Sequence, residues 1–328
     1  MTGYRVAIFG QIEETGRSAL EADARFSLAC LPDHAPGRFE AAADADAIIV
    51  RMTPIDTDLI EAAPRLRFVA RHGVGHDTVD KAALTARGIP LAITGDVNSG
   101  AVAEHALALM LAAAKRVVDY DKAVKAGDFA IRDSFSAGEL HGKTALLVGF
   151  GRIGRKVAAL ARAFGMDVLV FDPLLETTPE GVTSVSRLED GLAAADYVSL
   201  HAPKTARTTH LIDAEALARM KPGATLINVA RGGLVDEAAL SEALLSGRLR
   251  AAALDVFENE PPAADDPVLS APGLIATPHS AAFTSECAAR MSMACARNVI
   301  DFFDGGLDPD LVVNKDALAN AGASGGAA

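Results

Sequence analysis

The sequence predicts an α/β protein with two doubly wound parallel sheets, and three observations carry this prediction. Short apolar runs alternate with helical patterns along most of the 328 residues, which favours parallel strands covered by helices on both faces. One of these runs leads directly into a G-x-G-x-x-G turn. The alternation is interrupted near Ser99 and then resumes, and a chain of this length can form two domains.

The glycine-rich turn belongs to a compact unit of about 30 residues. In order, the unit consists of an apolar run, the glycine turn, a helical pattern, a second apolar run and an acid, at residues 145–148, Gly149 to Gly154, 155–164, 168–171 and Asp172. This order is typical of a dinucleotide-binding βαβ unit. A glycine turn without a ligand is the alternative, and the ordered context argues against it.

Four residues of this unit have a physical reason to be there. Gly149 permits the tight turn, Gly151 lets the backbone approach a pyrophosphate, and Gly154 allows the helix to pack closely on the strand. The N-terminus of the helix offers N–H groups and a positive dipole end to the phosphates. Asp172 can accept hydrogen bonds from ribose hydroxyls and would repel a 2′-phosphate, so we predict NAD rather than NADP.

The other elements follow the same alternation. Before Ser99, apolar runs predict strands at 5–9, 47–50, 67–70 and 88–93, with a helix at 57–63. After the glycine unit, strands are expected at 197–200, 225–229, 251–255 and 274–277, and helices at 213–220, 236–246 and 285–304. Residues 102–118 predict a long helix that is apolar almost all round, so it is buried in the fold or against a partner subunit. Residues 317–328 have no pattern and predict a disordered tail.

Composition limits the partners and the location that we expect. A net charge of −12 argues against nucleic acid as the main partner. No apolar run is long enough to span a membrane, and the N-terminus has no signal-peptide pattern, so we expect a soluble protein. The three cysteines, Cys30, Cys287 and Cys295, lack metal-ligand spacing. They fit a reducing cytoplasm, and we expect no metal.

Three polar residues follow apolar strands or lie in proline-containing loops. Arg231 follows a strand and can bind a carboxylate with two hydrogen bonds. His279, in a Thr-Pro-His sequence, can take up or return a proton near neutral pH. A glutamate beside this histidine would orient it and favour the imidazolium. Both Glu258 and Glu260 are candidates for that glutamate, and residue chemistry does not choose between them.

The chain resembles the D-isomer-specific 2-hydroxyacid dehydrogenase family, over about residues 45–315. The matching stretches are RHGVGHD (71–77), NS (98–99), VAEH (102–105), VGFGRIG (148–154), VSLHAP (198–203), MKPG (220–223), INVARGGLVD (227–236), ALDVFENEP (253–261) and TPH (277–279). The resemblance implies a flavodoxin-like substrate domain, 1–97 plus 284–316, and a Rossmann cofactor domain, 98–283, with the active site in the cleft between them. It also implies a homodimer formed by the 102–118 helix and the segment after it.

The resemblance assigns roles residue by residue. The family's catalytic residues fall on Arg231, Glu260 and His279, and its glutamate is the one directly before proline, which selects Glu260 over Glu258. The cofactor-binding residues that it implies are Gly149, Gly151, Arg152, Ile153, Gly154, Asp172, His201, Ala202, Pro203, Val229, Ala230 and Asp255, of which Asp255 would contact the nicotinamide amide. The substrate-binding residues are Arg51, Arg71, Val74, Gly75, Arg231 and His279.

The resemblance also implies a reaction, in which hydride passes between a small D-2-hydroxy acid and NAD to give the 2-keto acid. The chain looks most like the phosphoglycerate dehydrogenase branch, although it departs from that branch at VRMTP (50–54) and ends soon after Asn314, so we expect no regulatory domain. Two arginines, Arg51 and Arg71, suggest a substrate with a second anionic group, such as 3-phosphoglycerate. The alternatives are a glyoxylate or hydroxypyruvate reductase and, less favoured, an NAD-sensing corepressor that binds proteins; formate dehydrogenase, with Gln in place of Glu260, is a weaker rival.

Overall fold

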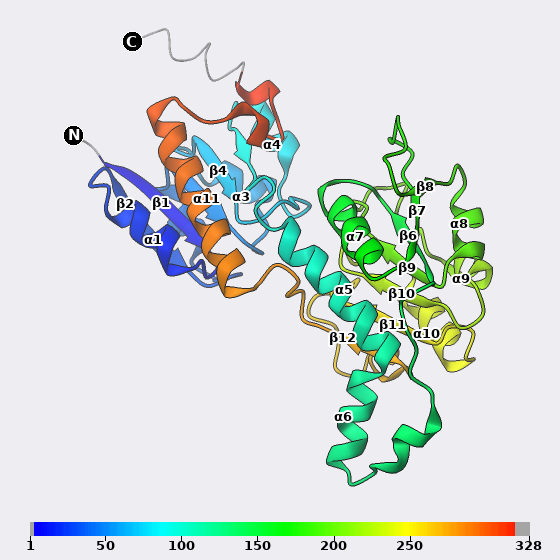
Figure 1. Ribbon diagram of the computed structural model, residues 1–328. Helices are drawn as coiled ribbons and strands as arrows, with labels where there is room; N and C mark the ends of the chain where they lie inside the picture. Colours follow the sequence, from blue (N-terminus) through cyan, green and yellow to red (C-terminus); the bar gives the residue numbers. More distant parts are fainter. Residues whose placement is uncertain (1–2, 319–328) are drawn as a thin grey trace. The chain divides into compact units, whose positions relative to one another are not determined.

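The computed structural model describes residues 3–318, which fold into two compact units (Figure 1). The first unit contains residues 3–98 and 283–318, and the second is Ser99–Ala282. No helix of the described residues combines the length and the apolar character that crossing a membrane requires. Because the first unit is made from both ends of the described chain, the second is an insertion within it.

The first unit contains a five-stranded sheet in the order β2-β1-β3-β4-β5, and all its neighbouring strands are parallel. Its strands are β1 (Tyr4–Phe9), β2 (Phe26–Leu31), β3 (Ala47–Val50), β4 (Phe68–Arg71) and β5 (Leu91–Ala92). This order is that of flavodoxin-like folds. Strand β3 is buried along its whole length, as expected for a strand between helix layers.

Five α-helices cover this sheet, and four of them are short. They are α1 (Glu14–Glu21), α2 (Arg38–Ala43), α3 (Thr57–Glu61), α4 (Lys81–Ala86) and the long α11 (Ser285–Asp304). Helix α11 packs against α1 and β4, where Phe302 stacks on Phe68 with ring centroids 4.6 Å apart. The short 3₁₀ helix η3 (Pro309–Leu311) follows α11, and Val313 then donates a backbone hydrogen bond to Leu91.

The second unit contains a seven-stranded parallel sheet in the order β12-β11-β10-β9-β6-β7-β8. Its strands are β6 (Thr144–Val148), β7 (Asp167–Phe171), β8 (Thr183–Ser184), β9 (Tyr197–Leu200), β10 (Thr225–Asn228), β11 (Ala251–Leu254) and β12 (Leu274–Ala276). Counted from β6, the first six strands have the order 3-2-1-4-5-6, which defines the Rossmann fold. The predicted fold class is therefore confirmed in both units.

Helices lie on both faces of this sheet. They are α5 (Ser99–Lys115), α6 (Val117–Lys125), α7 (Arg152–Ala163), α8 (Leu188–Ala194), α9 (Ala214–Arg219) and α10 (Glu237–Leu245), with 3₁₀ helices η1 (Ala130–Ser134) and η2 (Pro267–Ser270). Helix α5 packs against α7 and β10, so the buried alternative for the 102–118 helix applies to most of its length.

Two expectations about helix and chain ends need adjustment. The single helix expected at 102–118 is two helices, because Arg116 adopts a left-handed conformation with φ of 54° between α5 and α6. Ala317, in the segment expected to be a disordered tail, is buried and donates a backbone hydrogen bond to Asn314. Residues 319–328 of that expected tail lie outside the described residues.

Candidate functional site

The predicted site residues of the second unit meet at one edge of its sheet. The strands are parallel, and their last residues form a row in which Val148 pairs with Leu200, Leu200 with Asn228, Asn228 with Leu254, and Leu254 with Ala276. The residues that follow this row are Gly149, His201, Val229, Asp255 and Thr277. Ligands of such sheets bind at this carboxyl edge, where the strand order reverses between β6 and β9.

The three glycines of the glycine turn differ in the space around them. Gly149 has a φ of 95°, and a Cβ there would lie 2.7 Å from the carbonyl carbon of His201, so no other residue fits. A Cβ on Gly154 would lie 2.4 Å from the carbonyl oxygen of Gly149, whereas one on Gly151 would meet nothing within 4 Å. The turn is thus closed by protein on one side and open above Gly151.

The N-terminus of α7 lies directly after this opening. Gly151 is its N-cap residue and no described side chain caps it, so the first N–H groups, near Arg152 and Ile153, point out of the helix end. Asp172 lies at the end of the neighbouring strand and accepts hydrogen bonds from the N–H of Phe150, at 2.8 Å, and of Leu174, at 2.9 Å. Its carboxylate therefore ties the end of β7 to the glycine turn.

His201, Ala202 and Pro203 follow β9, beside the glycine turn. The His201 Nε2 atom lies 3.0 Å from the hydroxyl oxygen of the buried Ser199, and burial lowers the pKa of His201 to about 4. This histidine is therefore neutral at pH 7. It contributes shape and hydrogen bonding to this edge rather than charge.

Two Glu–His pairs stand beside this edge. The Nδ1 atom of His279 lies 2.7 Å from Glu260 Oε2, and the Nε2 atom of His210 lies 2.7 Å from Glu258 Oε1. The choice that residue chemistry left open thus has a geometric answer, because Glu260 and not Glu258 is the partner of His279. Glu260 also accepts the N–H of Phe257 at 3.1 Å. Although burial acts to raise it, the pKa of Glu260 is lowered, because His279 donates a hydrogen bond and contributes positive charge.

The His279 loop is anchored by Asp255, whose side chain is 0 % exposed. The Asp255 carboxylate accepts the Thr277 hydroxyl at 2.6 Å and the N–H groups of Ser280 and Ala281, both at 2.9 Å. Its backbone oxygen accepts the N–H of His279 at 2.7 Å. Burial acts to raise the pKa of Asp255, yet hydrogen bonds, with that of His105 first, lower it overall. Asp255 thus supports the loop, and its contact with nicotinamide stays a prediction.

Arg231 is positioned through a neighbour that sequence reasoning missed. The buried Asn228 donates from Nδ2 to the carbonyl oxygen of Arg231 at 2.9 Å and accepts the N–H of Ala230 at 3.0 Å. The Arg231 guanidinium donates to the carbonyl oxygen of Ala230 at 2.6 Å. An Asn at the end of a strand, three residues before Arg231, is the sequence signal for this role, and it is a weak one.

In the first unit, Arg51 follows β3 and is already in contact with an acid. Its Nε atom lies 3.2 Å from Asp33 Oδ2, and its guanidinium carbon lies 5.1 Å from the centre of the Phe283 ring. Asp33 Oδ1 accepts the N–H of Met52 at 3.0 Å. Asp33 lies close to Gly10, where a Cβ would be 2.5 Å from the carboxylate. Sequence reasoning missed Asp33, because it lies in an irregular loop after a strand that was not predicted.

The Gly73 turn directly follows β4, and its role in binding the substrate carboxylate stays a prediction. Gly73 has a φ of 130°, and the Arg71 guanidinium folds back onto the carbonyl oxygen of His72. Among residues 3–318, the N–H groups of Val74 and Gly75 form no hydrogen bond. His72 is buried with Nε2 3.2 Å from Ser292 Oγ, and burial, aided by the charges of Arg71 and Arg51, lowers its pKa to about 4.

Comparisons with known proteins agree with this geometry. Residues 107–281 match the family described as "D-isomer specific 2-hydroxyacid dehydrogenase, NAD binding domain". The chain is 44 % identical to the D-3-phosphoglycerate dehydrogenase of Mycobacterium leprae over 283 residues, which are 85 % of this chain and 53 % of the relative. It is 40 % identical to the glyoxylate reductase of Korarchaeum cryptofilum over 319 residues, 94 % of this chain and 95 % of the relative.

Solved structures extend the likeness to the fold. The D-lactate dehydrogenase of Aquifex aeolicus, complexed with NAD and lactic acid, is 29 % identical with a TM-score of 0.84, covering 94 % of this chain and 99 % of that one. The chain spans about half the length of the curated phosphoglycerate dehydrogenases that it matches. The predictions of the family and of an NAD cofactor are confirmed. The chain belongs to the D-isomer specific 2-hydroxyacid dehydrogenase family.

Proposed function

We propose that this protein is an NAD-dependent oxidoreductase that transfers a hydride between a small D-2-hydroxy acid and NAD, giving the 2-keto acid. The observation that carries this proposal is the His279–Glu260 pair, with its 2.7 Å contact, at the carboxyl edge that also contains the glycine turn. Arg231 and a proton-transfer group at one sheet edge suit a substrate that has a carboxylate next to a hydroxyl. When bound, NAD accepts the hydride from C2 of the acid or returns it.

The residues of the chain account for the proton and for the charges. The Nδ1 atom of His279 faces Glu260, so Nε2 is the atom that takes the hydroxyl proton in oxidation and returns it in reduction. Glu260 stabilises the imidazolium that forms. Arg231 binds the substrate carboxylate, and the roles of Val74 and Gly75 as further donors to that carboxylate stay predictions.

A panel of 2-keto acids, each assayed with NADH, tests the reaction. We expect turnover with at least one small 2-keto acid and loss of that turnover in His279→Ala. Turnover that survives in His279→Ala, or a purified protein that binds NADH yet reduces no member of the panel, would argue for the non-enzymatic alternative.

The residues around the glycine turn fit NAD rather than NADP. The opening above Gly151, the uncapped α7 end and the Asp172 carboxylate supply space, N–H donors and a ribose acceptor. A 2′-phosphate would meet the negative charge of Asp172. We expect a clear preference for NADH in kcat/KM and a smaller preference in Asp172→Ala; equal efficiency with both cofactors in the wild type would contradict this assignment.

Two substrate classes differ in the group at the far end of the substrate. A second anionic group, as in 3-phosphoglycerate, would suit Arg51 and Arg71. One observation favours the second candidate, reduction of glyoxylate or hydroxypyruvate: Asp33 already neutralises Arg51 at 3.2 Å. The Asp33 carboxylate competes with a substrate anion for Arg51. A hydrogen bond to a charged group usually contributes about 1.5–3 kcal/mol to binding, and the contribution of Arg51 to substrate binding would be smaller.

Asp33→Asn distinguishes the two candidates, because it keeps an acceptor for the Met52 N–H and removes the charge. If Arg51 binds the substrate tail, kcat/KM for a dianion such as oxaloacetate should rise relative to 2-oxobutyrate, by about tenfold. Asp44→Asn is the matched control, since Asp44 is 3.7 Å from Arg5 and has no contact with Arg51. An unchanged ratio in Asp33→Asn would remove Arg51 from the substrate site.

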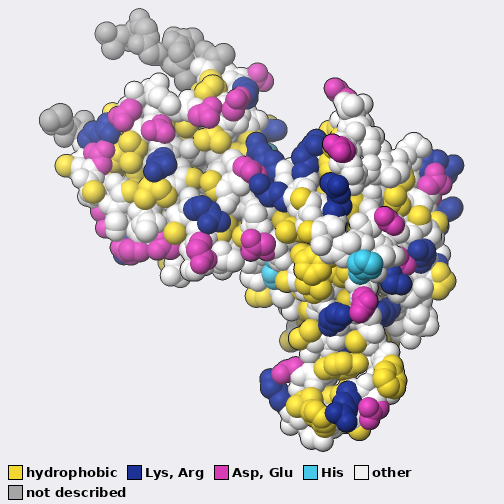
Figure 2. All heavy atoms as spheres, viewed as in Figure 1, with side chains coloured by type: hydrophobic (Ala, Val, Ile, Leu, Met, Phe, Trp, Pro, Cys, Tyr) yellow, Lys and Arg dark blue, Asp and Glu magenta, His cyan; other side chains and the backbone are white. Residues whose placement is uncertain are grey.

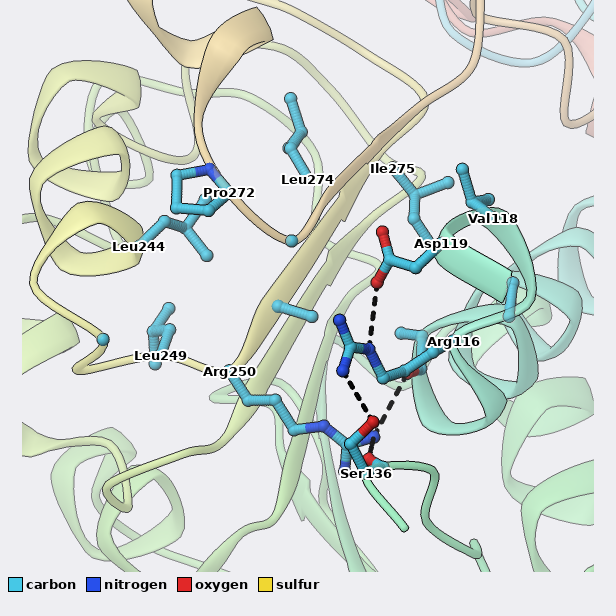
Figure 3. A pocket seen from close by; sticks show the side chains of 15 residues that line it. Arg116, Val118, Asp119, Ser136, Leu244, Leu249, Arg250, Pro272, Leu274 and Ile275 are labelled. Atoms are coloured by element: carbon cyan, nitrogen blue, oxygen red, sulfur yellow. Dashed lines mark hydrogen bonds and ion pairs between the residues drawn. The ribbon is translucent and has the colours of Figure 1, made fainter. Parts of the chain in front are cut away.

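We also propose that the protein is a cytoplasmic homodimer that uses α6 and the segment after it. Exposed hydrophobic side chains gather there (Figure 2), namely Val117, Val124, Phe129 and Phe135. A cavity of about 670 Å³ lies between the end of α5 and β12, with Arg116 bonded to Asp119 and Ser136 at its wall (Figure 3). None of the residues that line it is a predicted site residue.

The cytoplasmic location is supported by the free thiols of Cys30, Cys287 and Cys295, which fit a reducing compartment.

Phe135 tests the dimer, because it is 87 % exposed and lies at the end of this segment. A contiguous apolar surface favours a protein partner of matching shape. We expect the wild type to sediment as a dimer. The Phe135→Asp dimer should dissociate at protein concentrations at which the wild type is still dimeric. Leu174→Asp is the control, because Leu174 is 86 % exposed in another loop. A monomeric wild type at micromolar concentration would contradict the proposal.

A further inference from the structure

Glu237 lies beside the loop that carries Glu260 and contacts the backbone of that loop. It is the first residue of α10, directly after the N-cap residue Asp236. Its Oε1 atom accepts the backbone N–H of Glu258 at 2.7 Å. That peptide group lies two residues before Glu260, on the loop that presents Glu260 to His279.

The same loop rests on the loop of Arg231. A Cβ on Gly232 would lie 1.6 Å from the carbonyl oxygen of Phe257 and 2.9 Å from the nitrogen of Glu258. The two backbones are therefore in direct contact beside Arg231, and the Glu237 bond is formed to the same peptide segment. Any movement of the Phe257–Glu258 segment changes the position of Glu260 on one side and of the Arg231 loop on the other.

We infer that Glu237 is a positioning residue, whose hydrogen bond to the Glu258 backbone holds the Glu260 loop against the Arg231 loop in the geometry that proton transfer needs. It acts through the peptide N–H and not through the side chain of Glu258, which is turned toward His210 at 2.7 Å. This inference rests on the proposed function, because it assumes that Glu260 and His279 act in the reaction.

The electrostatic surroundings of Glu237 give this role a pH dependence. Burial raises the pKa of Glu237 to about 7, and the nearby carboxylates of Glu258, Asp266 and Glu260 act in the same direction, while the Glu258 N–H acts to lower it. The neighbouring charge of Glu258 is in turn shared with His210. Glu237 therefore changes charge near neutral pH, where the carboxylate form is the stronger acceptor.

Three variants separate a positioning role from a structural one. Glu237→Gln keeps an acceptor oxygen, Glu237→Ala removes it, and Glu237→Met removes it while keeping most of the side-chain length, in case the alanine variant does not fold. Glu242→Gln, an exposed residue of the same helix, is the matched control for loss of one charge. For each folded variant, kcat, KM and the dissociation constant of NADH are measured from pH 6 to 9.

We expect Glu237→Ala or Glu237→Met to lose about tenfold or more in kcat, with NADH affinity unchanged within about twofold. Glu237→Gln should recover most of that loss. Its kcat should no longer show the part of the change near pH 7 that comes from Glu237, whereas the limb that depends on the Glu260–His279 pair should remain. Hydrogen exchange at the Glu258 amide should be faster in the alanine and methionine variants. This exchange measurement needs no turnover, so it tests the contact even if the proposed reaction is wrong.

Two outcomes would overturn the inference. One is a Glu237→Ala or Glu237→Met enzyme with wild-type kcat. The other is a Glu237→Gln variant that loses as much kcat as Glu237→Ala does, because the hydrogen bond to the Glu258 N–H would then not account for the effect. A wild-type protein that reduces no 2-keto acid, by contrast, would count against the proposed function and leave the exchange result to decide the positioning contact.

Discussion

The two Glu–His pairs of the second unit are nearly the same in local geometry and differ in their surroundings. Both contacts are 2.7 Å, and both histidines have left-handed backbones, with φ of 52° for His279 and 49° for His210. The Glu260 side chain is 25 % exposed and that of Glu258 is 33 % exposed. Only the His279 loop is anchored by the buried Asp255, and only Glu260 has a second, backbone hydrogen bond.

The two pairs share a contact distance, so distance alone does not distinguish them, and their surroundings do. An exposed ion pair contributes about 0–1 kcal/mol to stability and can rearrange freely. A pair that acts on a substrate needs a fixed orientation, and fixed orientation comes from the backbone and from buried neighbours. The Glu260–His279 pair has backbone hydrogen bonds and a buried neighbour, Asp255. In the other pair, His210 is exposed. If this difference in surroundings decides function, substitutions in the Glu260–His279 pair should lower activity and matched substitutions in the Glu258–His210 pair should not.

The largest expected effect is that of His279→Ala compared with His210→Ala. Loss of the general acid–base group should lower kcat by about 10²–10⁴-fold. His210→Ala removes an imidazole with the same contact distance and the same backbone conformation, and we expect kcat to stay within about threefold of wild type. Steady-state kinetics of both variants with NADH and the best 2-keto acid measures this. Similar losses in the two variants would end the distinction between the pairs.

The next effect is that of Glu260→Gln compared with Glu258→Gln. Glutamine at 260 keeps an acceptor for the Phe257 N–H but no longer stabilises an imidazolium, so kcat should fall by about 10–10²-fold. The alkaline limb of the pH profile for reduction should also move to lower pH. Glu258→Gln should change neither quantity. A Glu258→Gln profile that shifts like that of Glu260→Gln would mean that both pairs share one proton-transfer network.

A smaller effect concerns acid stability. The folded-state pKa of Glu260 lies below the ordinary value of 4.5, so its carboxylate contributes stability above that pH, and the contribution is lost as the pH falls through the folded pKa. Below pH 4.5 the melting temperature of the wild type should therefore fall more steeply than that of Glu260→Gln. Melting curves between pH 3 and 6 test this. Parallel curves would show that the His279 contact adds no stability.

The smallest expected effect is on the stability of the exposed pair. Because His210 and Glu258 are screened by water and salt, Glu258→Gln should lower the melting temperature at pH 7 by no more than about 2 °C, and added salt should remove the difference. Thermal melts at 0.05 and 0.5 M salt are sufficient. A large decrease in melting temperature that salt does not remove would show that the Glu258 side chain stabilises the fold through more than an exposed ion pair.

Most of the fold was predictable, because the strands next to the site are short apolar runs that end on Gly, Arg or Asp. The observed β3, β9 and α11 have the predicted bounds. The strand β2 and the helices α1 and α2 were not predicted, since β2 is an outer strand with a mixed burial pattern and the helices are short. The break at Arg116 was missed for a different reason, because both sides of it are apolar and helical.

The glycines of the candidate site could be proposed from their order and spacing. His279, Glu260 and Arg231 were assigned through the family resemblance, because each residue type taken alone has a structural alternative. The supporting residues were not predictable, since Asn228, Glu237 and Asp33 act through backbone groups or through an arginine far away in sequence. Their partners become visible only when β10, α10 and the irregular loops are placed in space. Propensity and periodicity carry no information about such contacts.

The long α11 helix also has a consequence for biosynthesis. Its buried residues Cys295 and Val299 join the same core as Val6, Ile8 and Phe68, although almost the whole chain separates them in sequence. On a ribosome, the first hundred residues emerge without this helix, so one face of their sheet has only α1 to cover it. The inserted second unit can complete its core earlier, because Ser99–Ala282 contains all of its own strands. The part that is made first therefore finishes folding last, and until then it is the part that a chaperone has reason to protect.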